Sequence, residues 1–94
     1  MQITIPHQLT TQEVRARLDA HAPELAGGMA EVRASWHDEE HMDLAIKAMG
    51  QTLTGEIALA PGEAIITIEL PLALAFMEST IARSITDKGT QLLS

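Results

Sequence analysis

The fold of this chain is decided by residues 30–70, which read AEVRASWHDEEHMDLAIKAMGQTLTGEIALAPGEAIITIEL. Apolar and polar residues alternate with a period of two through most of this stretch, a pattern typical of strands with one buried face. Residues 37–41, Gly50-Gln51 and Pro61-Gly62 interrupt the alternation with residues that favour turns. The stretch therefore predicts four antiparallel strands that form a meander.

One phase of the alternation is expected to point into the core and the other, which carries most of the charged and hydroxyl side chains, into water. The expected inward residues are Ala30, Val32, Ala34, Trp36, Met42, Leu44, Ile46, Ala48, Leu53, Gly55, Ile57, Leu59, Ala64, Ile66, Ile68 and Leu70.

The residues before the meander predict a strand and then a helix. Residues 1–7 read as a short strand with Pro6 at an edge or at its end. Thr10 and Glu13 match a capping box, which starts a helix. The apolar stripe of this helix is expected at Val14, Leu18, Ala22 and Leu25. Pro23 should kink or shorten the helix, and Gly27-Gly28 should stop it.

After Pro71 the apolar residues follow a helical period. Leu74, Met77, Ile81 and Ile85 fall on one side of the predicted helix. Gly89 is expected to end it. Residues 90–94 would then form a disordered tail unless Leu92 docks on the core.

Together the elements predict a two-layer α+β fold in the order β-α-β-β-β-β-α, with a curved antiparallel sheet and two helices packed on one face. The 94 residues are enough for a single domain, residues 1–94. We expect the first strand to pair with the last strand of the meander.

Composition excludes several classes of partner. The net charge is −7 and the six basic residues are scattered, which argues against nucleic acid. No apolar run is long enough for a transmembrane segment, and the first residues do not resemble a signal peptide. The absence of Cys suits a cytoplasmic protein.

The residues that could bind a metal or a ligand are better explained by structural roles. His37-Asp38-Glu39-Glu40-His41 is close to a helical zinc motif, but Asp38 stands where that motif needs Glu, and the run lies between two predicted strands. We interpret it as an acidic turn, with adventitious cation binding as the alternative. Trp36 shares the inward phase, so core packing is favoured over ligand stacking. We expect no catalytic residues, no cofactor and no metal site, and therefore no enzyme.

The start of the last helix has more apolar surface than one sheet needs. Leu72 and Phe76 fall roughly opposite Leu74 and Met77, and Ala75 adds to the same surface. Either the first helix or a sheet edge encloses this segment, or Leu72, Ala75 and Phe76 form a surface for a partner.

The chain also resembles a known family, the polyhydroxyalkanoic acid system (granule-region) proteins, over essentially its full length. The resemblance rests on the Leu9-Thr10-x-x-Glu13 helix start, Trp36 at the end of the first meander strand, the segment from Gly50 to Gly55, and Leu70 leading into a helix with spaced Ile residues. It implies association with bacterial polyester storage, with no established enzymatic activity and no functional residues to carry over.

Two functions are therefore expected. The first is a non-enzymatic accessory or interaction protein linked to polyhydroxyalkanoate storage, which acts through Leu72, Ala75 and Phe76 on a second copy, another protein or a hydrophobic granule surface. The alternative is a module that binds an acyl chain or another apolar small molecule in a pocket between sheet and helix.

Overall fold

In a computed structural model, which describes residues 1–21, 24, 31–48 and 50–94, the elements follow the predicted order. The strands and helices are β1 (Gln2–Pro6), α1 (Thr11–His21), β2 (Glu31–Trp36), β3 (His41–Ala48), β4 (Gln51–Ala60), β5 (Glu63–Glu69), the 3₁₀-helix η2 (Leu72–Met77) and α2 (Glu78–Leu92). The fold is α+β, as predicted.

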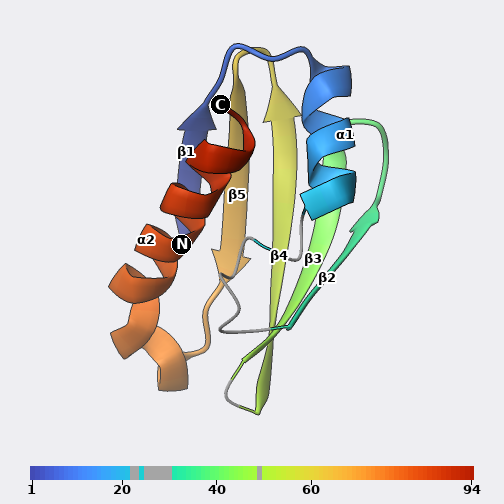
Figure 1. The fold of residues 1–94 in the computed structure, drawn as a ribbon. Coiled ribbons are helices and arrows are strands. Elements are labelled where there is room, and N and C mark those ends of the chain that lie inside the picture. The colour runs from blue at the N-terminus through green and yellow to red at the C-terminus, as the bar shows by residue number, and fades with distance from the viewer. Residues whose placement is uncertain (22–23, 25–30, 49) are drawn as a thin grey trace.

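The five strands form one antiparallel sheet in the order β1-β5-β4-β3-β2 (Figure 1). Strands β2 to β5 are joined as the predicted meander, and β1 pairs with β5, as expected from the sequence. Gly62 turns the chain between β4 and β5 with φ of 77°, a conformation that costs glycine little. The sheet thus has β1 and β2 at its two edges.

Both helices lie on the same face of the sheet (Figure 1). α2 packs over β1, α1 packs over β4, and the two helices contact each other. The core lies between these layers. Its buried apolar residues are Ile3, Ile5, Val14, Leu18, Val32, Met42, Leu44, Ile46, Leu53, Ile57, Leu59, Ala64, Ile66, Ile68, Leu74, Ile85 and Leu93.

The predicted start of α1 is confirmed. The backbone N–H of Thr10 donates to Glu13 Oε1, and the N–H of Glu13 donates to Thr10 Oγ1, both at 3.1 Å. The bond from Thr10 lowers the pKa of the Glu13 carboxyl, because it favours the charged form. The remaining predictions for this region concern Ala22, Pro23, Leu25, Gly27, Gly28 and Ala30, which lie outside the described residues.

Three predictions need correction. Ala34 is exposed, because the alternation sets the direction of a side chain but does not supply an element to cover it on the edge strand β2. The segment after Pro71 begins as the 3₁₀-helix η2 and becomes α-helical only at Glu78. Gly89 does not end α2, which continues to Leu92.

The last residues of the chain are held in place, which is the exception that the expectation for residues 90–94 allowed if Leu92 docks on the core. Leu93 is buried with 4% of its surface exposed, and Leu92 packs against the core. Arg17 Nη1 donates to the backbone oxygen of Leu92 at 3.0 Å and also to that of Ser94. A glycine inside a helix, such as Gly89, reduces stability by about 1 kcal/mol. Burial of a leucine, such as Leu93, adds about 1.5–3 kcal/mol, so the gain from docking exceeds the loss from the glycine.

Candidate functional site

The feature that stands out on the surface is an apolar tip, formed by Leu72, Ala75 and Phe76. Leu72 is 94% exposed and Phe76 is 76% exposed, and these two are the large apolar side chains that the described residues present to solvent. Ala75, between them, is also exposed. Water is a poor environment for such side chains, because hydration of apolar surface is unfavourable.

The backbone explains why the apolar tip points outward. Pro71 is extended (φ −61°, ψ 150°), and its carbonyl accepts the first hydrogen bond of η2, from the N–H of Leu74 at 2.9 Å. A 3₁₀-helix has three residues per turn, so Leu74 and Met77 share one side. Leu74 is buried and Met77 packs against the core. The inner side of η2 therefore anchors it, and the apolar tip faces away.

In Figure 1 the beginning of the C-terminal helical segment, in orange, lies at the end of the sheet where β5 finishes. The sequence left open whether other elements enclose this segment. The structure places Leu72, Ala75 and Phe76 in solvent, separate from the core side chains of the same segment. All three residues named from the sequence are thus exposed.

Trp36 has a structural role between α1 and the β2–β3 turn. Its ring packs against the core, and Nε1 donates to Asp19 Oδ1 at 2.5 Å. The Arg15 guanidinium lies 4.1 Å from the ring centroid, and Arg15 Nη1 donates to the backbone oxygen of Glu39 at 2.6 Å. One face of the indole is therefore taken by Arg15 in a cation–π contact, which leaves that face unavailable for ligand stacking.

Sequence reasoning found Trp36 as a packing residue but missed both of its polar partners. Asp19 and Arg15 are far from Trp36 along the chain, and their spacing in α1 carries no signal for that contact. The one general signal is that a packed indole N–H usually has a hydrogen-bond acceptor, which predicts a partner for Trp36 without saying which residue it is.

The run from His37 to His41 forms a turn, as predicted, and β3 begins at His41. His41 Nδ1 lies 2.8 Å from Asp38 Oδ1, whereas His37 Nδ1 lies 3.6 Å from Asp43 Oδ2. The two histidines thus pair with different carboxylates. Within the described part of the chain, no group of three or more potential metal ligands comes together.

The hydrogen bonds of this turn shift two pKa values. The N–H of Glu40 donates to Asp38 Oδ1 at 2.8 Å, and this bond, followed by the contact with His41, lowers the pKa of the Asp38 carboxyl. The hydrogen bond with Asp38 raises the pKa of His41, and the nearby charges of Asp38, Glu56 and Glu40 act in the same direction. Both shifts have local causes in an exposed turn, which favours a structural interpretation.

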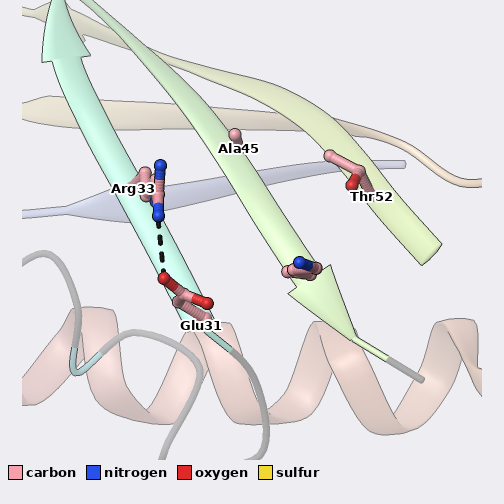
Figure 2. Close-up of a pocket in the computed structure, with 5 residues that line it drawn as sticks. Glu31, Arg33, Ala45 and Thr52 are labelled. Carbon is pink, nitrogen blue, oxygen red and sulfur yellow. Dashed lines mark hydrogen bonds and ion pairs between the residues drawn. The ribbon is translucent and has the colours of Figure 1, made fainter. Parts of the chain in front are cut away.

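Two open pockets of about 250 Å³ each lie on the uncovered face of the sheet, opposite the helices. Figure 2 shows the first, where Arg33 pairs with Glu31 (Nε to Oε1, 3.4 Å) beside Ala45 and Thr52. Lys47 also lines it. The second pocket is lined by Thr54, Gly55, Glu56, Thr67 and Glu69. The alternative function predicted from the sequence requires a pocket for an apolar ligand between sheet and helix. Neither of these two pockets lies there.

Comparison with known proteins places the chain in a family. A sequence model of the family described as "Putative polyhydroxyalkanoic acid system protein" matches residues 1–93. The chain belongs to this family. The resemblance inferred from the sequence is confirmed, and the family description links the chain to polyhydroxyalkanoate systems. No curated protein matches it, and no solved structure does. Among the described residues, no helix has the length and apolarity needed to cross a membrane.

Proposed function

We propose that this chain is a non-enzymatic accessory protein of polyhydroxyalkanoate storage, and that its apolar tip attaches it to the uncharged hydrophobic surface of the stored polyester. The observation that carries the proposal is the exposure of Leu72 and Phe76 on a segment that Leu74 fixes to the core. The family membership supplies the polyester context.

The size of the apolar tip favours a continuous apolar surface over a folded protein partner. Two large side chains and an alanine present a few hundred Å² at most. A stable protein–protein interface needs roughly 800 Å² from each partner. A side chain that enters an apolar phase gains about 1.5–3 kcal/mol without the need for a matching pocket.

The charge of the segment favours an uncharged surface. The first charged residue after the apolar tip is Glu78, and the first basic residue is Arg83. Segments that bind anionic lipid usually combine apolar residues with Lys and Arg. The net charge of −7 would repel an anionic surface, whereas a neutral polyester carries no such penalty.

The non-enzymatic part of the proposal is supported by where the shifted pKa values lie. Functional groups usually have pKa values that are perturbed by burial and neighbouring charge in a cleft. In the described part of the chain, the clear shifts belong to Glu13 in a helix cap and to Asp38 and His41 in an exposed turn. Each is explained by hydrogen bonds that shape the backbone.

The proposal is tested by co-sedimentation of the purified chain with protein-free polyhydroxyalkanoate particles. Phe76→Asp places a charge in the apolar tip and should reduce binding at least about tenfold, which corresponds to about 1.4 kcal/mol. Because Phe76 is 76% exposed, the circular dichroism spectrum and the unfolding midpoint should stay close to those of the wild type.

The matched control is Thr86→Asp, which adds the same charge to an exposed position of α2 away from the apolar tip. It should bind particles like the wild type. Equal loss of binding in both variants would show that charge alone controls attachment, and unchanged binding of Phe76→Asp would refute a role for the apolar tip.

A further inference from the structure

The uncovered face of the sheet carries an ordered arrangement of charge. The strand register aligns Arg33, Ala45, Thr54 and Glu69 as neighbours across β2, β3, β4 and β5. We call these four residues the charge row. It has a cation at one end, a carboxylate at the other and two small residues between them.

All members of the charge row are available at the surface. Arg33 is 82% exposed in its side chain, Thr54 and Glu69 are exposed, and Ala45 is half-buried. Thr54 Oγ1 donates to Glu69 Oε2 at 3.3 Å, which holds the carboxylate over the sheet. Figure 2 shows Arg33 and Ala45 on the same side of the sheet, with the helix behind it.

We infer that the uncovered face binds a second copy of this chain, with the two sheets face to face. A two-fold axis that runs parallel to the strands, between β3 and β4, reverses the strand order in the second copy. Arg33 of one copy then lies over Glu69 of the other, and the reverse pair forms at the same time. Such an isologous contact is the commonest way in which identical subunits pair.

The geometry suits two packed sheets. An axis parallel to the strands keeps the two sets of strands aligned, which is the usual arrangement of sheets packed face to face. Ala45 and Thr54 lie at the centre of the charge row and are small enough for the sheets to approach to about 10 Å. A two-fold axis in the plane between the sheets and perpendicular to the strands would instead place β2 over β2, so Arg33 could not face Glu69.

The available area is enough for a weak dimer. Strands lie about 4.8 Å apart and rise about 3.3 Å per residue, so the four strands β2 to β5 that this axis superposes offer on the order of 450 Å² per copy. The pair would bury on the order of 900 Å², which is the size of weak, transient interfaces. This is more than the apolar tip provides.

One neighbouring row opposes the pairing. Asp43 and Glu56 are register partners on β3 and β4, so the same axis brings Asp43 of one copy near Glu56 of the other. Each has a histidine nearby, since His37 Nδ1 lies 3.6 Å from Asp43 Oδ2 and His41 Nε2 lies 3.9 Å from Glu56 Oε1. These acidic residues weaken the dimer, and the charge row sets its orientation.

The test is the mass in solution across a concentration series at physiological salt, by sedimentation equilibrium. The wild type should approach twice the chain mass of 10.1 kDa. Arg33→Glu and Glu69→Lys should each raise the dissociation constant about tenfold or more, because like charges then face each other. Lys88→Glu, which makes the same type of change on α2, should leave the dimer intact.

The decisive experiment mixes the two single variants, Arg33→Glu and Glu69→Lys. Each reversed charge then meets its complement, so the mixture should form heterodimers, and the double variant Arg33→Glu/Glu69→Lys should form homodimers again. A monomeric wild type, or a mixture that stays monomeric, would overturn the inference. Loss of the dimer in Phe76→Asp would overturn the inference too, because that outcome assigns self-association to the apolar tip. If the wild type is monomeric but still binds particles, the dimer inference fails and the proposed function stands.

Discussion

At the scale of single residues, Gly55 shows how closely β4 and β5 approach. A Cβ atom at Gly55 would lie 2.8 Å from the backbone oxygen of Thr67 and 3.2 Å from Ile68 Cδ1. Since backbone must move to relieve such contact, Gly55→Ala should lower the free energy of unfolding by about 1–3 kcal/mol. Urea unfolding measures this, and Thr52→Ala, at an exposed position of the same strand, should change it by less than about 0.5 kcal/mol. An unchanged free energy of unfolding in Gly55→Ala would contradict this close approach of β4 and β5.

Also at this scale, the His41–Asp38 pair predicts a pH dependence. The pKa of His41 is raised, so its contribution to stability is present below its ordinary value of 6.5 and is lost as pH rises through the folded-state pKa. The pKa of Asp38 is lowered, so its contribution is present above 3.8 and is lost as pH falls through the folded-state pKa. The pair stabilises the turn most between these two values.

The measurement is an NMR titration of the His41 ring. Asp38→Asn should bring the pKa of His41 down towards its ordinary value, because the hydrogen bond to the carboxylate is the largest cause of the shift. Asp43→Asn, which removes the carboxylate beside His37, should leave the His41 titration in place. If the pKa of His41 is the same in Asp38→Asn as in the wild type, the His41–Asp38 pair does not form in solution.

At the scale of elements, the end of α2 depends on a contact that local sequence does not encode. Leu93 is buried against the core just after the helix. Leu93→Ala should reduce the free energy of unfolding by about 2–5 kcal/mol, and amide exchange should become faster over residues 89–93. Gln91→Ala, at an exposed position of the same turn, should have little effect. Equal stability of both variants would show that the end of α2 is not docked.

The same element explains which predictions from sequence could succeed. The capping box of α1 and the alternation in β3 to β5 are local patterns, and the structure follows them. Gly89 also gives a local signal, for a helix end, but the distant contacts of Leu93 and Arg17 override it. Ala34 had the right phase, yet exposure depends on what covers an edge strand.

At the scale of the whole molecule, the topology separates two surfaces that the sequence could reveal only in part. The apolar tip was visible as surplus apolar residues after Pro71, although only the fold shows that Leu72 is exposed. The charge row was invisible, because Arg33 and Glu69 meet in one row only through the pairing of four strands. Periodicity predicts elements, and register is needed to predict surfaces of this kind.

Entry of the apolar tip into a hydrophobic surface can be tested directly because the chain has no Cys. Ala75→Cys and Thr86→Cys each introduce one thiol, at an exposed site inside and outside the apolar tip. Each variant is labelled with an environment-sensitive fluorophore and mixed with polyhydroxyalkanoate particles. The label at residue 75 should show a blue shift and a rise in emission, and the label at residue 86 should change little. No shift at residue 75, or equal shifts at both positions, would contradict entry of the apolar tip.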